Sequence, residues 1–171
     1  MSGQRSHAGH LVSLIALVMV GCQRPPSAIT TTNKEVVREF FAALDAQDFD
    51  ALSDLLVEEF VAHPADGTDR VGRDAVFELI RGFYSSFPDY THTIEAVIAE
   101  GDVVAGRVNY GGTHRGDFRG VAPTGRQVDY NGMFMLKVVD GMVTEAWSID
   151  DNLNLISQLG MELVPASPAR Q

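Results

Sequence analysis

The hydrophobic period of this chain changes at Pro88, and that change limits the folds that the chain can adopt. Before Pro88, apolar residues recur three and four positions apart, the spacing that places them on one face of a helix. After Pro88, apolar and polar residues alternate, which is typical of half-buried strands. Helices followed by a run of strands predict an α+β domain, with the helices packed on one face of a curved, mainly antiparallel sheet.

Three helices are expected in the first half of the domain and one at its end. The first follows a capping box at 32–35, and the second begins at Asp50, capped by Asp48 or by Asp50 itself. The third spans 73–83, and the last spans 153–159. The expected strands are 59–63, 90–99, 103–114, 127–139 and 142–150.

A two-residue turn at 140–141, Asp-Gly, predicts how the last two strands pair. If the pairing is regular, Phe134 lies opposite Trp147 and Tyr130 lies opposite Asp151. Because side chains alternate between the faces of a sheet, Asp151 is then expected on the inner, aromatic face. Burial on such a face disfavours the charged form of a carboxyl group, which suits a general acid or base near neutral pH.

Two alternatives to this placement of Asp151 stay open. Asp151 also precedes the last predicted helix, where an aspartate side chain commonly caps the first free amides. A one-residue bulge would exchange the two faces and bring Asp150 inward in its place. The strand register therefore decides which of the two adjacent acids enters the core.

The N-terminus has the pattern of a bacterial export signal. Residues 1–10 carry the cation Arg5 and no acid, and residues 11–20 are apolar except for Ser13, a run too short to span a bilayer as a helix. The segment VMVGC, ending at Cys22, resembles the lipobox of bacterial lipoproteins. We expect lipidated Cys22 to anchor the protein in the bacterial cell envelope, facing the periplasm. The alternative is an ordinary signal peptide with an incidental cysteine.

One domain is expected behind this anchor. Residues 1–21 form the signal peptide, 22–33 a flexible tether, 34–164 the domain and 165–171 a disordered tail. Cleavage removes one of the 13 Lys and Arg residues and none of the 23 Asp and Glu residues, so 12 cations face 23 anions. This negative charge argues against nucleic acid as a partner and against electrostatic binding to anionic lipid.

The chain resembles the SnoaL-like polyketide cyclase (ester cyclase) family in three stretches, FPDYTHTIEAVIAEGDVVAGRV, GGTHRGDFRGVAPTGRQV and EAWSIDDNLNLISQLG. The resemblance extends over residues 34–161. It implies the cone-shaped α+β barrel of the nuclear transport factor 2-like superfamily. That scaffold hosts cyclases, isomerases, epoxide hydrolases and non-catalytic binding modules, so the reaction must be inferred from the site.

The resemblance also implies roles for individual residues. The family's Trp-Asp-x-x-Asp pattern falls on Trp147, Ser148 and Asp151, which keeps the second acid as the catalytic residue and replaces the first by serine. His63 and His114 match family histidines, and one of them is expected to hydrogen-bond a developing enolate oxygen, whereas His92 matches none. The expected aromatic walls of the substrate pocket are Trp147, Tyr130 and Phe134.

We therefore expect an enzyme of the cyclase type in which Asp151 removes a proton α to a carbonyl group of an apolar small molecule, without a cofactor. One open alternative is a ketosteroid isomerase-like or epoxide hydrolase-like enzyme, in which a hydrolase relay would centre on Arg107. Another is a membrane-tethered binding module without turnover.

The sequence also bears on metal binding and on assembly. The histidines of the mature chain are far apart in sequence and form no i, i+4 pair, so no metal site is expected. An apolar outer sheet face predicts a homodimer. The residues expected on that face are Met133, Met135 and Val139.

Overall fold

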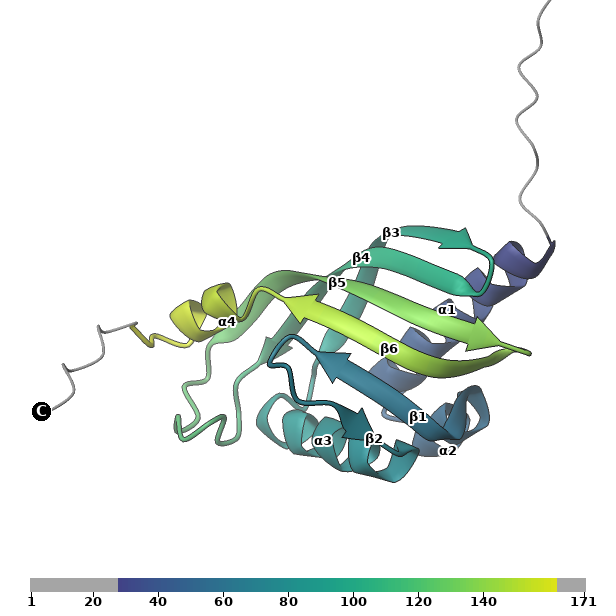
Figure 1. Ribbon diagram of the computed structural model, residues 1–171. Coiled ribbons are helices and arrows are strands. Elements are labelled where there is room, and N and C mark those ends of the chain that lie inside the picture. Colours follow the sequence, from purple (N-terminus) through teal and green to yellow (C-terminus); the bar gives the residue numbers. More distant parts are fainter. Residues whose placement is uncertain (1–27, 163–171) are drawn as a thin grey trace, which may run out of the picture.

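The computed structural model describes residues 28–162, and their strands form one six-stranded sheet. The chain order is α1 (Ala28–Ala46), α2 (Phe49–Leu55), β1 (Leu56–Pro64), β2 (Arg70–Val71), α3 (Arg73–Ser86), β3 (Thr91–Glu100), β4 (Val103–Thr113), β5 (Gln127–Val139), β6 (Met142–Asp150) and α4 (Asn152–Gln158). Figure 1 shows α1, α2 and α3 on one face of the sheet and α4 at its end. The predicted α+β class, with helices on one face of a sheet, is confirmed.

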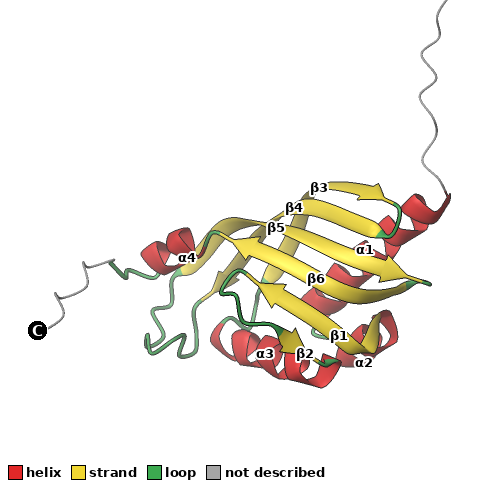
Figure 2. Ribbon diagram, in the orientation of Figure 1, coloured by secondary structure: helices red, strands yellow, loops and turns green. Residues whose placement is uncertain are grey.

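The sheet is mainly antiparallel, as predicted. Its strand order is β2-β1-β6-β5-β4-β3, and β3 to β6 form an antiparallel meander in which consecutive strands are neighbours. The exception is β1, which pairs with β6 in parallel. This pair brings the end of β1 beside the end of β6, so the first and last strands of the domain meet at the same place (Figure 2).

The start of α1 differs from the prediction, and the start of α2 agrees with one of the two predicted caps. Helix α1 begins at Ala28, so the capping box at 32–35 lies inside the helix and residues 28–33 are helical instead of part of the tether. Helix α2 is capped by Asp48, whose Oδ1 accepts a hydrogen bond from the backbone N–H of Ala51 at 3.0 Å. That contact decides between the two acids proposed as its cap.

The structure describes none of the predicted N-terminal export signal. The signal peptide at 1–21, Cys22 and the tail at 165–171 lie outside the described residues. Within residues 28–162, no helix combines the length and the apolar character needed to cross a membrane.

The hydrophobic core lies between the helices and the inner face of the sheet. Because each buried aliphatic or aromatic side chain contributes roughly 1.5–3 kcal/mol, this layer is the main source of the domain's stability. Its members come from every helix and from strands β1, β4, β5 and β6. The largest completely or almost completely buried apolar side chains are Phe60, Phe87, Leu52, Leu56, Leu155, Val37, Val104, Val108, Val138 and Val143.

The pairing of β5 with β6 contains a one-residue bulge. Val138 pairs with Val143 but Lys137 pairs with Glu145, so Thr144 has no partner. Beyond the bulge, Phe134 lies opposite Ser148 and not opposite Trp147. The regular register predicted from the Asp-Gly turn is therefore wrong, and the two faces of the second half of β6 are exchanged.

This exchange also reverses the predicted placement of the two acids. Asp150 lies opposite Gly132, in the row of β5 residues that faces the core. Asp151 is exposed and caps α4, since its Oδ1 accepts a hydrogen bond from the backbone N–H of Asn154 at 3.0 Å. The prediction that Asp151 faces the interior is wrong, and both alternatives to it hold.

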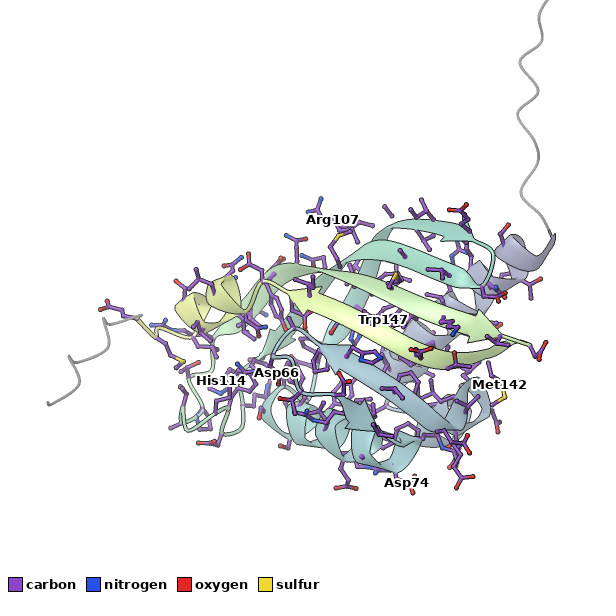
Figure 3. The ribbon with its side chains drawn as sticks, viewed as in Figure 1. Asp66, Asp74, Arg107, His114, Met142 and Trp147 are labelled. Carbon is purple, nitrogen blue, oxygen red and sulfur yellow. The ribbon has the colours of Figure 1, made fainter. Side chains whose placement is uncertain are left out.

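The outer face of the sheet carries exposed apolar side chains. Met133 on β5 is 54% exposed and Ile149 on β6 is 68% exposed, and the two are directly paired. Met135 is also exposed, and its partner is Trp147. The bulge therefore places tryptophan on the outer face, where it adds to this apolar surface (Figure 3).

Candidate functional site

A cavity of about 320 Å³ lies between the inner face of the sheet and helix α3. Its volume falls at the lower end of the range of small-molecule sites. Aromatic side chains form much of its wall, namely Phe83, Tyr84, Tyr90, Tyr110, Phe118 and Tyr130. Polar side chains contribute at a few points, namely Asp66, Arg70, His92, Arg119, Ser148, Asp150 and Asn152.

The strand register aligns one row of the cavity wall. His92 on β3 pairs with Tyr110 on β4, which in turn pairs with Tyr130 on β5. Since directly paired residues share a face, the imidazole and the two phenols lie side by side across three strands. The His92 and Tyr110 rings meet edge to face at 5.4 Å, and the Tyr110 and Tyr130 ring centroids are 5.1 Å apart.

Asp150 is the carboxylate that lies inside this cavity. Its Oδ1 is buried without a hydrogen bond of good geometry, and the Tyr110 hydroxyl lies beside the carboxylate. Burial raises the pKa of Asp150 above its ordinary value, and the nearby Tyr110 hydroxyl and His92 offset only part of that rise. A carboxyl group with a raised pKa at the wall of a cavity is suited to accept and return a proton.

Gly132 leaves the space in which the Asp150 carboxylate sits. A Cβ atom at this position would lie 2.7 Å from Asp150 Oδ1 and 2.6 Å from a ring carbon of Tyr110. Both contacts are shorter than van der Waals distance, so any larger residue would displace one of these side chains. Glycine is needed here for close approach, in the middle of a strand where it otherwise weakens the sheet.

Three tyrosine hydroxyls surround the carboxylate. Tyr90 and Tyr130 share a buried hydrogen bond between their hydroxyl oxygens. Burial is the main cause that raises the pKa of Tyr90, Tyr110 and Tyr130 above the ordinary value, and the Asp150 charge adds to the rise. All three phenols therefore keep their protons at neutral pH. Because one of Tyr90 and Tyr130 donates to the other and Tyr110 faces Asp150, the second hydroxyl of the Tyr90–Tyr130 pair is the donor left for a ligand oxygen.

His92 is held in place by Asp45, near the end of α1. Asp45 Oδ1 accepts hydrogen bonds from the His92 backbone N–H at 2.9 Å and from Nδ1 at 2.6 Å. A carboxylate can only accept, so Nδ1 carries the proton and Nε2 remains for a second contact. The His92 side chain is 8% exposed and also borders a groove between α1 and β3.

The structure places His63 outside the cavity. Its ring stacks on Trp147 at 4.9 Å on the outer face, and its Nδ1 lies 2.9 Å from Asp69 Oδ1. The next residues along the chain, Pro64 and Ala65, do line the cavity. The predicted contact of His63 with a substrate oxygen is therefore not supported, although the histidine lies near the cavity mouth as the resemblance implied.

His114 lies in the core at the end of β4 and not in the cavity wall. It is completely buried, its ring stacks on Phe87 at 5.3 Å, and its Nδ1 accepts a hydrogen bond from the Thr124 backbone N–H at 3.2 Å. The backbone of His114 also pairs with Arg126 and Gly125. These contacts close the loop between β4 and β5, so the position of His114 is that of a structural anchor (Figure 3).

Of the three predicted aromatic walls, only Tyr130 lines the cavity. Trp147 lies on the outer face, and Phe134 packs in the core against Phe41 at a ring distance of 4.8 Å. Arg107, the proposed centre of a hydrolase relay, also lies outside. It is 53% exposed and its Nε is 2.8 Å from Glu95 Oε2 (Figure 3).

The sequence analysis offered Asp150 only as the bulge alternative and did not select His92, and the strand register identifies both. Asp150 needed the bulge, whose signal is weak in sequence. His92 needed only its pairing with Tyr110, because alternation from Tyr90 places both residues on the aromatic face. Across residues 28–162, no group of three or more His, Cys, Asp or Glu side chains is arranged to hold a metal ion.

Comparison with known proteins identifies the family. The family model of SnoaL-like polyketide cyclases matches residues 34–159, which is most of the chain. The chain belongs to the SnoaL-like polyketide cyclase family. No curated protein matches the chain.

Several solved structures are similar to this SnoaL-like chain. IdmH of Streptomyces antibioticus, described as a candidate polyketide cyclase, is 31% identical over 75% of this chain and 99% of its own, with a TM-score of 0.69. AclR of Streptomyces galilaeus, described as a candidate hydroxylase, is 30% identical over 80% and 86%, with a TM-score of 0.71. A candidate SnoaL-like cyclase of Jannaschia sp. CCS1 is 26% identical over 81% and 98%, with a TM-score of 0.75. These matches confirm the nuclear transport factor 2-like fold and a family that acts on or binds small molecules.

The buried charge of Asp150 predicts a specific pH dependence of stability. Because burial raises the pKa of Asp150 on folding, the folded protein holds a proton that the unfolded chain releases between the two pKa values. The Asp150 contribution to stability is therefore highest below the unfolded value and falls as pH rises through the folded value. We expect Asp150→Asn to raise the stability at pH 7 by about 1 kcal/mol, or the Tm by about 3 °C.

Thermal melts from pH 4 to pH 8 check this prediction. The stabilisation by Asp150→Asn should shrink as pH falls toward 4, because protonation removes the charge of the wild-type carboxyl group. Asp151→Asn is the matched control, since asparagine caps a helix as well as aspartate does and its melt should follow the wild type. The quantity to compare is the Tm of Asp150→Asn minus the Tm of wild type at each pH. A smaller difference at pH 7 than at pH 4 would contradict the buried charge.

Proposed function

We propose that this protein catalyses proton transfer on an apolar carbonyl compound, with Asp150 as the general acid and base of a cyclase-type reaction. The observation that carries this proposal is the Asp150 carboxylate inside an aromatic cavity, with a buried Oδ1, the Tyr110 hydroxyl beside it and no cation paired with it among the described residues. A fold has little reason to keep an unpaired charge in its interior unless the charge acts on a ligand.

The surrounding side chains supply the rest of the chemistry. Asp150 removes a proton from the carbon next to a carbonyl group, and negative charge develops on the carbonyl oxygen. The Tyr90–Tyr130 hydroxyl pair lies in the same cavity, and the hydroxyl that is not donating within the pair can donate to that oxygen. His92, oriented by Asp45, offers a further contact through Nε2.

Ring closure follows from the same arrangement. The enolate carbon attacks a second carbonyl carbon of the same molecule, and a carbon–carbon bond forms as the C=O π bond of the second carbonyl opens. The resulting alkoxide takes back the proton held by Asp150, so no other acid or cofactor is needed. Membership in the SnoaL-like polyketide cyclase family and the similarity to IdmH support this reaction class.

Hydrogen exchange of a simple ketone tests the proton transfer without the natural substrate. We expect the wild-type protein to accelerate exchange of the α protons of 1-tetralone in D₂O, measured by NMR. Asp150→Asn should lower that acceleration roughly 100-fold or more, because an amide is not a base. Asp151→Asn should retain it within about twofold, since Asp151 is an exposed helix cap.

The outcomes separate the enzyme from a binding module. Binding of 1-tetralone without accelerated exchange would support a module without turnover. Equal loss in both variants would contradict the assignment of Asp150, and unchanged exchange in Asp150→Asn would remove it from the mechanism.

We further propose that the protein is exported and anchored through a lipid on Cys22. The support is the short apolar run before Cys22 and its lipobox-like segment. A fatty-acid probe fed to the expressing bacteria should label the wild type and leave Cys22→Ala unlabelled. Label on the variant would exclude lipidation at Cys22.

A homodimer through the outer sheet face is also proposed. The exposed Met133, Met135 and Ile149 form an apolar surface with Trp147 beside them. Light scattering of the chain from residue 28 should give a dimer mass at micromolar concentration, and Met133→Glu should shift it to the monomer. Leu153→Glu changes an equally exposed residue on α4 and should not. A monomeric wild type would refute the proposal.

A further inference from the structure

The loop between β4 and β5 carries an arginine in an unfavourable backbone conformation. Phe118 and Val121 exchange two backbone hydrogen bonds of 3.0 Å and close a two-residue turn whose central residues are Arg119 and Gly120. Both have positive φ, 53° for Arg119 and 82° for Gly120. Glycine and asparagine are favoured at such positions, and another residue there costs about 1 kcal/mol. Strain of this kind at a cavity points to a use for the side chain.

Two independent observations place the Arg119 side chain at the cavity. Arg119 and the neighbouring Phe118 both line the cavity, and the guanidinium carbon lies 5.1 Å from the centre of the Phe118 ring. Its positive charge also acts on Tyr130 in the cavity wall, where it partly offsets the pKa rise that burial causes. Arg119 itself is exposed, so its charge lies at the mouth and not in the interior.

The other charged groups at the mouth leave Arg119 available. Arg70 also lines the cavity, but its NH2 lies 3.6 Å from Asp66 Oδ2 and its NH1 donates to the Thr68 carbonyl. Within residues 28–162, Arg119 has no carboxylate oxygen within salt-bridge distance, whereas Arg115 in the same loop lies 4.0 Å from Asp89. An unpaired guanidinium beside an apolar cavity is a binding group for an anion.

We propose that the ligand of this cavity is a hydrophobic carboxylic acid, with its apolar body inside and its carboxylate at Arg119. The charges set this orientation, because Asp150 in the interior repels an anion and Arg119 at the mouth attracts it. The proposal deepens the proposed function, since it assumes that the ligand occupies the Asp150 cavity, but it does not require turnover. It assigns the class of substrate and the residue that selects it.

A matched pair of probes tests the charge preference. Isothermal titration calorimetry of the purified full chain should show that 2-naphthoate binds roughly tenfold more tightly than its neutral methyl ester. Arg119→Gln should weaken 2-naphthoate binding by about that factor and leave the ester unchanged. Arg115→Gln removes the same charge from the same loop, away from the cavity, and should preserve the preference. The wild-type preference should also shrink in 1 M NaCl, because salt screens an exposed pair.

The binding results test the ligand class separately from the proton-transfer activity. Equal affinity of wild type for acid and ester, or equal losses of both in Arg119→Gln, would overturn the inference. Loss of the preference in Arg115→Gln would assign it to the loop's general charge and would also overturn it. A charge preference that depends on Arg119, together with no exchange of 1-tetralone, would support the ligand class and refute the catalytic proposal. Absence of binding by both probes would refute the inference.

Discussion

Thr144 has no partner in the β5–β6 ladder, and every residue of β6 beyond it takes its orientation from that irregularity. Without the bulge, Trp147 would fill the space under the helices and the last carboxylate of the strand would face water. With it, the smaller Ala146 and Ser148 point inward opposite Leu136 and Phe134, and the space next to them stays open. One unpaired residue thus separates a filled core from a cavity with an acid in it.

The cavity works against the stability of the domain. Its walls are aromatic rings that would otherwise close on one another, and its floor carries a carboxylate that has lost most of its hydration. The surrounding structure maintains this arrangement through contacts behind the cavity wall. Asp45 holds the wall residue His92, and the contacts of His114 hold the β4–β5 loop. Binding sites are commonly kept in this way, with rigid support placed behind the reactive groups.

The fold was largely readable from the sequence, and the site was not. Strands β5 and β6 were predicted with the bounds that they have, because alternation and an Asp-Gly turn are local signals. Which face Asp150 and Asp151 occupy depends on a single bulge at Thr144, whose signal in the sequence is weak. His63 and His114 were selected by resemblance, yet the first lies on the outer face and the second is in the core. Residue type alone could not separate them from His92, since all three are histidines near the ends of strands.

Gly132 has a consequence for how this site can change during evolution. A side chain at 132 would occupy the volume of the Asp150 carboxylate, and a carboxylate at 150 excludes a side chain at 132. The two positions are therefore not independent, and the order of substitutions matters. A lineage that first lost the acid, and in which the Tyr110 ring then shifted aside, could fill the gap at 132 and gain strand stability. From that point the acid could not return in one step, so loss of the chemistry would be close to irreversible.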